Sequence, residues 1–268
     1  FSDHVSSFRR IKFLGSCPLE TIGENAFGNL SSFEGINFPK TVKTIGRNAF
    51  SNCKNMTYAN FADDAEIETI GENALGNCGL RTITIPASVK TIEREAFKNC
   101  EALTTVNIPT GTTMVNPEAF KFCDKLTEIN VAKDNQTYAS VDGILLTKNK
   151  RTLVSFPSGK ANEKFTLLPP SLTKIGDYAF YDCRKLTNVV IPQKVTSIGE
   201  RAFGLCANLN TVTLLCDNAL QATNIAQGEN KMAFDDGTQA ASMFSNITLY
   251  VRIAKKMDYL KQRFFGKF

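Results

Sequence analysis

The chain has 268 residues, of which 43% are hydrophobic and 21% are charged, a balance typical of a folded protein rather than a disordered one. Its net charge of +5 is mild and no Lys/Arg-rich arm is present, so we expect no nucleic-acid partner. No run approaches the roughly 18 consecutive apolar residues of a membrane-spanning helix, so we expect no membrane span in this chain.

A single pattern returns along the chain and defines its expected elements. Its clearest copies begin at Leu80 (LRTITIPASVKTIEREAFKNC), Leu103 (LTTVNIPTGTTMVNPEAFKFC) and Leu186 (LTNVVIPQKVTSIGERAFGLC). The Phe position of the shared Ala-Phe pair is held by Phe27, Phe50, Leu75, Phe97, Phe120, Phe180, Phe203 and, less regularly, Phe234. The first gaps of 23, 25, 22 and 23 residues lie within the range of roughly 20 to 29 residues that leucine-rich repeats show.

Within each copy, the residue types predict a strand, a turn and a short helical segment. A leading Leu and two aliphatic residues, as in Leu80, Ile83 and Ile85, point inward from a short β-strand. The following Pro, such as Pro86, has no N–H group for a sheet and ends the strand. Gly, as at Gly46, suits the next tight turn, and we expect the Ala-Phe pair to begin a short helical or 3₁₀ segment. One such unit cannot bury its apolar face alone, so neighbouring copies are expected to stack.

The expected fold is an α/β solenoid. It is a right-handed leucine-rich-repeat stack of about ten coils, with one parallel β-sheet face and short helical or 3₁₀ segments opposite. We interpret residues 1–268 as a single leucine-rich-repeat domain, with repeats at about 11–131 and 165–250.

Two segments depart from the repeat. The stretch at about 132–168 alternates like paired strands around a polar turn at Lys148–Lys150, which predicts helix-free coils or a hairpin-like interruption that continues the stack. We expect the segment at about 246–268 to be a helical cap, because the open end of a solenoid needs its apolar face covered. An amphipathic helix at a membrane surface is the alternative interpretation of this segment.

The I-G-x-x-A-F-x-x-C form resembles the BspA-like class of bacterial leucine-rich repeats, from roughly Ile11 to the C-terminus. The segment Tyr138-x-Ser140-x-Asp142-Gly143 resembles the helix-free interruption of that class, and the ending ITLYV resembles its C-terminal cap. The resemblance implies a secreted or surface-exposed protein of a host-associated organism, acting in adhesion or protein binding. The class has no catalytic residues to carry over.

The sequence holds no motif for catalysis, nucleotide binding or metal binding. Its single histidine, His4, leaves no partner for an H-E-x-x-H metal site or a triad. The closest cysteine pair, Cys206 and Cys216, is ten residues apart, so a zinc site is not expected. We therefore predict that the chain is not an enzyme and uses no cofactor or metal ion.

Two kinds of residue bear on covalent modification: the cysteines and the asparagines of N-x-[ST] sequons. The cysteines of one shared repeat position are expected to stack as a ladder of buried, unreactive thiols: Cys53, Cys78, Cys100, Cys123, Cys183 and Cys206. Cys17 and Cys216 lie off this ladder and are the better candidates for oxidation. The N-x-[ST] sequons at Asn29, Asn55, Asn135 and Asn246 matter only in a secreting eukaryote.

The outward-facing strand positions should align into two columns and form the candidate binding face. The predicted partner-binding residues are Asn37, Tyr58, Asn60, Thr82, Thr84, Thr105, Asn107, Glu128, Asn130, Asn188, Thr211 and Thr213. Most are Asn or Thr, which exchange hydrogen bonds at little desolvation cost compared with charges. Two interpretations stay open: a merely soluble face of Thr and laddered Asn, or a face that contacts an extended partner.

We predict a cell-surface or secreted binding protein that engages a macromolecule, most readily a host protein, through this sheet face. Because the chain begins at Phe1 rather than Met, we expect a processed upstream piece that could have carried a lipid anchor. We expect a monomer. The alternatives are a glycan-binding module of a polysaccharide-handling system and an architectural spacer, with Tyr58 as the only face aromatic arguing against a sugar-stacking platform.

Overall fold

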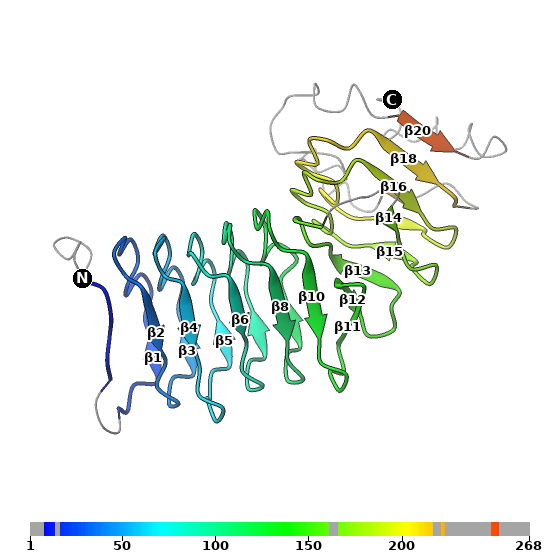
Figure 1. Ribbon diagram of the computed structural model, residues 1–268. Helices are drawn as coiled ribbons and strands as arrows, with labels where there is room; N and C mark the ends of the chain where they lie inside the picture. The colour runs from blue at the N-terminus through cyan, green and yellow to red at the C-terminus, as the bar shows by residue number, and fades with distance from the viewer. Residues whose placement is uncertain (1–7, 14–16, 161–165, 217–220, 223–247, 252–268) are drawn as a thin grey trace. The chain divides into compact units, whose positions relative to one another are not determined.

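The computed structural model describes residues 8–13, 17–160, 166–216, 221–222 and 248–251. The chain divides into two compact units, Phe1–Gly143 and Ile144–Phe268, each of which is described by itself (Figure 1). The division falls inside the expected interruption at about 132–168. The interpretation of the whole chain as a single domain stays a prediction.

Unit 1 is a stack of coils, and each coil contributes one strand to each of two parallel arrays. The first array, here called the main sheet, contains β2 (Gly35–Asn37), β4 (Tyr58–Asn60), β6 (Thr82–Thr84), β8 (Thr105–Ile108) and β10 (Glu128–Val131). The second is a five-stranded parallel sheet of β1 (Thr21–Ile22), β3 (Thr44–Ile45), β5 (Thr69–Ile70), β7 (Thr91–Ile92) and β9 (Met114–Val115), in that order. The strand β11 (Tyr138–Val141) follows.

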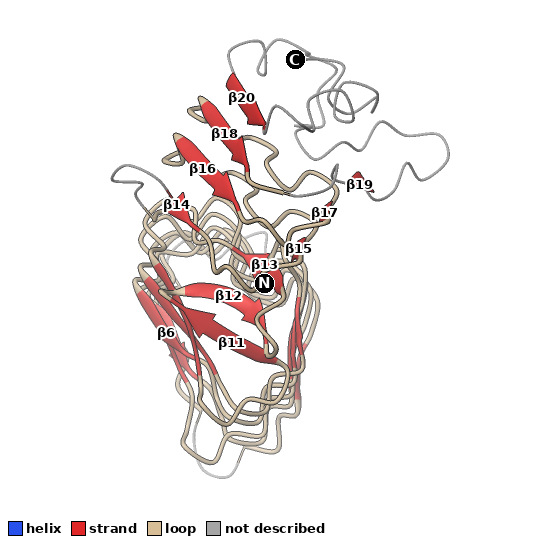
Figure 2. Cartoon of the chain, turned by 90° about the vertical axis from the view of Figure 1, so that its right-hand side faces the viewer, coloured by secondary structure: helices blue, strands red, loops and turns tan. Residues whose placement is uncertain are grey.

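The prediction of a single sheet face was wrong. Each coil turns back through a two-residue strand, usually Thr-Ile, and these strands pair in register, with Thr44 opposite Thr69 and Ile45 opposite Ile70. A strand of two residues shows no alternation, so a pattern of period two could not reveal it. In Figure 2, which views unit 1 along its stack, strands gather on two sides of the coil with loops between them.

Unit 2 begins with the expected hairpin. The strands β12 (Ile144–Thr147) and β13 (Thr152–Ser155) pair antiparallel on either side of the predicted turn, where the N–H of Lys150 donates to the Thr147 carbonyl at 2.8 Å. This confirms the hairpin prediction. From β13 the pairing continues in parallel through β15 (Lys174–Ile175), β17 (Ser197–Ile198) and β19 (Gln221–Ala222). A four-stranded parallel sheet contains β14 (Thr166–Leu167), β16 (Asn188–Ile191), β18 (Thr211–Leu214) and β20 (Thr248–Val251).

The prediction of short helical segments was also wrong for the described residues, where the Ala-Phe segments are turns. The N–H of Asn48 donates to the Glu72 carbonyl of the next coil at 2.9 Å, and the N–H of Phe50 donates to Ala74 at 2.8 Å. The N–H of Ala49 between them closes a turn within its own coil at 3.2 Å. An α-helix would direct every N–H along its own axis. Alternate N–H groups instead join neighbouring coils.

Residues in the left-handed backbone region mark these turns. Asn48 has φ of 53° and Asn52 has φ of 63°, and the same two repeat positions are left-handed in most coils. Asparagine tolerates this region better than other residues with a side chain, and one such residue ends a right-handed helix. Of the predicted helical cap, the structure describes only β20; the rest of the cap lies outside the described residues. Phe234 also lies outside them. For the described part, the fold is a β-solenoid.

The core runs along the inside of each stack. Phe50, Phe97, Phe180 and Phe203 are completely buried. Phenylalanine rings of successive coils lie over one another: Phe27 and Phe50 have centroids 5.2 Å apart, and Phe180 and Phe203 have centroids 4.8 Å apart. Such stacked pairs contribute about 0.5–1.5 kcal/mol each beyond the burial of their area.

The buried cysteine ladder is confirmed, and each of its thiols has a hydrogen-bond partner one coil earlier. The Cys100 thiol donates to the carbonyl of Leu75 at 3.2 Å, and the other ladder thiols make equivalent contacts. Burial raises the pKa of Cys53 to about 11 and that of Cys100 to about 12. Cys216, expected to be open to oxidation, is only 1% exposed and donates to Pro192, so Cys17, which is half-buried, is the better candidate.

Candidate binding face

The predicted partner-binding residues of unit 1 lie in two columns of the main sheet. The parallel registers place Asn37 opposite Asn60, Thr82 opposite Thr105, and Asn107 opposite Asn130. In unit 2, Asn188 lies opposite Thr211, and Val190 lies opposite Thr213. The exposed members are Asn37, Asn60, Thr82, Thr84, Asn107 and Glu128; the half-buried members are Tyr58, Thr105, Asn130, Asn188, Thr211 and Thr213. The structure thus brings the predicted residues together within each unit.

Asparagine side chains on the face bond to one another along the stack. The amide of Asn60 donates to the Oδ1 of Asn37 at 2.8 Å, and the amide of Asn130 donates to the Oδ1 of Asn107 at 3.4 Å. Each such bond uses one donor and one acceptor, while every Asn side chain carries two N–H groups and an oxygen with two lone pairs. The ladder therefore fixes the orientation of these amides. The amide of Asn130 also donates to Oε2 of Glu128 at 3.3 Å.

The main sheet of unit 1 is interrupted between β4 and β6. The strands β2 and β4 form one hydrogen-bonded pair, and β6, β8 and β10 form a separate three-stranded sheet. The coil before β6 is one residue shorter, since Leu80 follows Cys78 by two residues while Leu103 follows Cys100 by three. A Cβ atom on Gly79, in this shortened segment, would lie 2.5 Å from the carbonyl oxygen of Lys54, so the close approach requires glycine. The face of unit 1 consequently has two parts.

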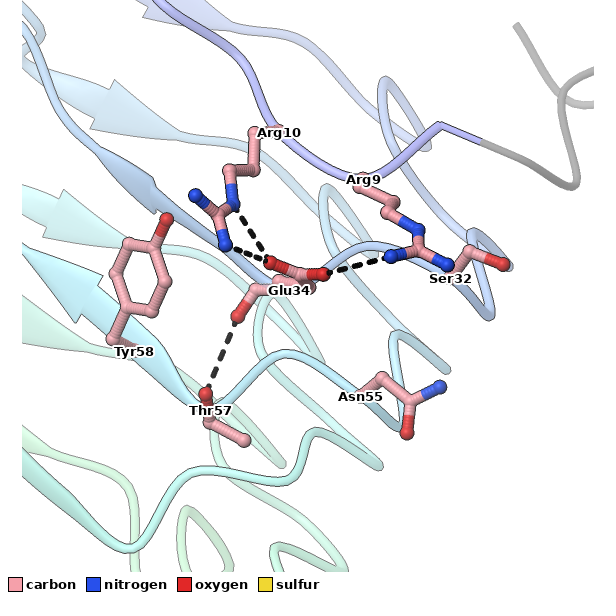
Figure 3. A pocket seen from close by; sticks show the side chains of 7 residues that line it. All are labelled: Arg9, Arg10, Ser32, Glu34, Asn55, Thr57 and Tyr58. Atoms are coloured by element: carbon pink, nitrogen blue, oxygen red, sulfur yellow. Dashed lines mark hydrogen bonds and ion pairs between the residues drawn. The ribbon is translucent and has the colours of Figure 1, made fainter.

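A polar pocket of about 500 Å³ adjoins the β2–β4 part of the face (Figure 3). Its lining residues are Arg9, Arg10, Ser32, Glu34, Asn55, Thr57 and Tyr58. Of these, only Tyr58 was predicted as a site residue. Arg9 and Arg10 were not predicted because they lie before the first complete repeat, and Glu34 was not predicted because it lies one residue before the outward column that begins at Gly35.

Backbone contacts hold the two arginines beside the first main-sheet strand. Arg10 forms a parallel bridge with Gly35, and the N–H of Glu34 donates to the Arg9 carbonyl at 2.8 Å. The ring of Tyr58 lies against Gly35, where an added Cβ would come within 2.5 Å of the ring carbon Cδ1. Glycine at position 35 thus allows the tyrosine ring to cover the backbone and form one side of the pocket.

Glu34 lies between the two guanidinium groups (Figure 3). The Nε of Arg10 donates to Oε2 of Glu34 at 2.7 Å and its Nη2 lies 2.6 Å from the same oxygen, whereas Arg9 reaches Oε1 only at 3.7 Å. The hydrogen bond and charge of Glu34 raise the pKa of Arg10. Arg10 and Tyr58 lie on one side of the carboxylate, and Arg9 and Ser32 lie on the other. Two positive charges against one negative charge leave the pocket with a surplus of +1.

Within the described residues, no group of three or more His, Cys, Asp or Glu side chains is arranged to hold a metal ion. The same part of the chain contains no helix long and apolar enough to cross a membrane. His4 lies outside the described residues.

Comparisons with known proteins agree with the coil architecture. The family model of the BspA type leucine rich repeat region matches residues 20–140 and 156–266, with six copies. Among curated proteins, none matches the chain.

Solved bacterial proteins share the fold. The chain is similar to a leucine-rich repeat protein from Eubacterium ventriosum, with 23% identity and a TM-score of 0.60 over 74% of this chain and 58% of that one. A leucine-rich repeat protein from Bacteroides ovatus gives 28% identity and 0.54, over 78% of this chain and 55% of that one. The pneumococcal vaccine antigen PcpA gives 17% identity and a TM-score of 0.54, over 91% of this chain and 82% of that one. The chain therefore spans less than two thirds of the length of the first two. Because the family model covers most of its residues, the protein belongs to the BspA-type leucine-rich-repeat family.

Proposed function

We propose that this protein is a binding protein of the cell surface or the extracellular space, and that it engages a host protein through the face of its main sheet in an adhesion-like role. The observation that carries the proposal is the register of polar, mostly uncharged side chains along this face, with Asn37 paired to Asn60 and Asn107 paired to Asn130. A solenoid face of this kind suits an extended contact area. The location is supported by the family and by the fold likeness to a pneumococcal vaccine antigen.

Neutral polar side chains favour a protein partner over nucleic acid. Asparagine and threonine can bond to backbone and side-chain groups of a partner without the desolvation cost of a charge. The two laddered asparagine pairs are fixed in orientation before binding, which lowers the entropy lost on association. We further propose that the chain acts as a monomer, without catalytic activity of its own.

The test is a pull-down of host extracellular-matrix and serum proteins with the purified chain. A face variant carries Asn60→Arg, Thr84→Arg and Asn107→Arg. A control variant carries Thr44→Arg, Thr69→Arg and Thr91→Arg, which add the same charge to the second sheet. We expect a partner that the parent and the control capture and that the folded face variant loses.

Other outcomes would overturn the proposal in distinct ways. Loss in the control variant alone would assign binding to the second sheet. Capture of no protein, with binding of the parent to a glycan array, would favour the glycan-binding alternative. Binding of neither kind would favour an architectural spacer.

A further inference from the structure

We infer that the pocket of Arg9, Arg10, Glu34 and Tyr58 is an anchoring site for a carboxylate side chain of the protein partner. The inference rests on the proposed function and adds the chemistry of one contact. It concerns the β2–β4 part of the face, where the pocket opens beside Tyr58 (Figure 3).

The charge of the pocket selects an anion. Arg10 is held by Glu34 through contacts of 2.7 and 2.6 Å, so one positive charge is compensated within the chain. Arg9 meets the same carboxylate only at 3.7 Å and its side chain is 74% exposed, so its guanidinium keeps N–H groups for another acceptor. A guanidinium matches the geometry of a carboxylate with two parallel hydrogen bonds.

Neutral residues of the pocket lining fit the same ligand. Asn55 uses its Nδ2 to donate to the Ser31 carbonyl at 2.7 Å, which fixes the side chain at the pocket wall. Tyr58 provides a half-buried ring on the other side of Glu34. The pocket volume of about 500 Å³ exceeds that of an Asp or Glu side chain, so the carboxylate can enter together with part of the backbone that carries it.

The two columns beside the pocket are neutral except at Glu128, on the distant strand β10. The neutral, repeating columns do not by themselves fix where a partner lies along the stack. An acidic residue of the partner bound in the pocket would therefore set the partner's position. Charges at an interface contribute more to register and specificity than to affinity.

The probe is a labelled peptide of sequence Ser-Thr-Glu-Glu-Thr-Ser-Thr-Ser, with the two Glu residues replaced by Gln in a matched peptide. Its dissociation constant is measured by fluorescence anisotropy with the parent, with Arg9→Gln and with Arg81→Gln. Arg9→Gln keeps the Arg10–Glu34 pair intact. Arg81→Gln removes an exposed charge immediately before β6, at a residue that does not line the pocket.

We expect Arg9→Gln to weaken binding of the Glu peptide about tenfold, in line with the loss of a charge-assisted contact. Arg81→Gln should change it less than about twofold, and the Gln peptide should bind the parent as weakly as the Glu peptide binds Arg9→Gln. Equal effects of Arg9→Gln and Arg81→Gln, or equal binding of the two peptides by the parent, would overturn the inference.

The pull-down separates this inference from the proposed function. A partner lost by the face variant but retained by Arg9→Gln would leave the proposed function standing and refute the carboxylate anchor. If peptide binding depends on Arg9 but no host protein is captured, the carboxylate site stands and the proposed function is refuted.

Discussion

The hydroxyl oxygen of Tyr138 accepts a hydrogen bond from the backbone N–H of Val115 at 2.9 Å. Val115 lies on β9, the last strand in the order of the five-stranded sheet of unit 1. A further strand would offer a carbonyl oxygen at this point, so the tyrosine replaces a strand with a side chain. Tyr138 is 8% exposed, and its bond satisfies an N–H group that is shielded from water. The helix-free interruption thus ends the sheet without leaving this edge group unpaired.

Tyr138→Phe should lower the free energy of unfolding by about 1–3 kcal/mol, because it leaves the buried N–H of Val115 without an acceptor. Urea unfolding measures the loss, and amide hydrogen exchange should show faster exchange at Val115 than in the parent. Tyr58→Phe, at a half-buried face position, is the control and should leave exchange at Val115 unchanged. Unaltered protection of Val115 in Tyr138→Phe would contradict the assigned role.

Asn135 holds the same interruption in place and cannot serve as a glycosylation acceptor in the folded protein. It is completely buried, and its Nδ2 donates to the carbonyls of Pro109 and Thr112 at 2.7 and 3.0 Å. Its Oδ1 accepts from the N–H groups of Thr137 and Tyr138 at 2.8 and 2.7 Å. Asn135→Ala should cost about 3 kcal/mol, since it leaves several buried groups unpaired.

The matched control for Asn135 is another sequon residue. Asn55 is exposed and donates one bond, to Ser31, so Asn55→Ala should cost less than about 1 kcal/mol in the same urea experiment. Equal costs for the two variants would show that Asn135 does not hold the interruption. The sequon at Asn29 is exposed, and that at Asn246 lies outside the described residues.

The coil period and the core positions were accessible from the sequence, because buried side chains repeat with the spacing of the coils. Phe50, Phe97 and Cys100 are completely buried, as the pattern predicts. The turns were misassigned because the Ala-Phe segment has the composition of a short helix. The asparagine that flanks it on each side, as at Asn48 and Asn52, was the available signal for left-handed backbone.

The binding pocket could not be predicted for a different reason. Arg9 and Arg10 precede the first complete repeat and lie in a partial copy of it, in which Phe8 and Ile11 correspond to Phe33 and Ile36. Their approach to Tyr58 depends on the backbone bridge between Arg10 and Gly35. The spacing of 25 residues between Arg10 and Gly35 equals one coil and is consistent with their pairing, but it does not show that the side chains beside this bridge enclose a pocket. The outward columns of Asn and Thr, by contrast, follow from strand alternation alone, although their role in binding stays a proposal.

Because the backbone at Asn52 is left-handed, glycine and alanine at this position should differ in their effect on stability. Asn52 has φ of 63°, its N–H donates to Gly76 at 2.8 Å and its side chain donates to Asn29 at 2.9 Å. Asn52→Ala should be less stable than Asn52→Gly by about 1–2 kcal/mol, since both lose the side-chain bond but only alanine meets the steric penalty of this conformation. Thermal or urea unfolding decides the order, and equal stabilities would exclude strain at this turn.

Thiol reactivity should separate Cys17 from the other cysteines. Burial raises the pKa of Cys53 to about 11 and that of Cys100 to about 12, so these two ladder thiols carry almost no thiolate near neutral pH. In the folded protein, a disulfide reagent at about pH 8 should modify Cys17 and leave the buried thiols intact, whereas guanidinium should expose all eight. Mass spectrometry of the labelled peptides identifies the sites. Rapid labelling of Cys100 in the folded protein would contradict its burial.

A buried ion cluster on the turns of unit 1 should make stability depend on pH. The carboxylate of Glu95 is paired with Lys98 at 2.9 Å and with Lys121, whose side chain is only 10% exposed and also reaches Glu118 at 3.0 Å. Burial alone would raise the pKa of Glu95, but hydrogen bonds from Lys121 and Lys98 outweigh it and hold the pKa below its usual value. The stabilisation is therefore complete above the unfolded pKa of about 4.3 and is lost as the pH falls through the lower folded value.

Glu95→Gln should lower the free energy of unfolding by about 1–3 kcal/mol at pH 7, because the buried Lys121 then keeps one anionic partner instead of two. At about pH 3, below the unfolded pKa, the parent has begun to lose the same contribution, so the difference between the two proteins should shrink. The control is Glu68→Gln, which breaks an exposed pair with Lys90 and should change stability far less at either pH. Urea unfolding at the two pH values measures the free energy of unfolding of the parent and of both variants. A Glu95→Gln deficit that stays constant between them would show that the charge of Glu95 contributes nothing, and that the cluster stabilises the turns by packing alone.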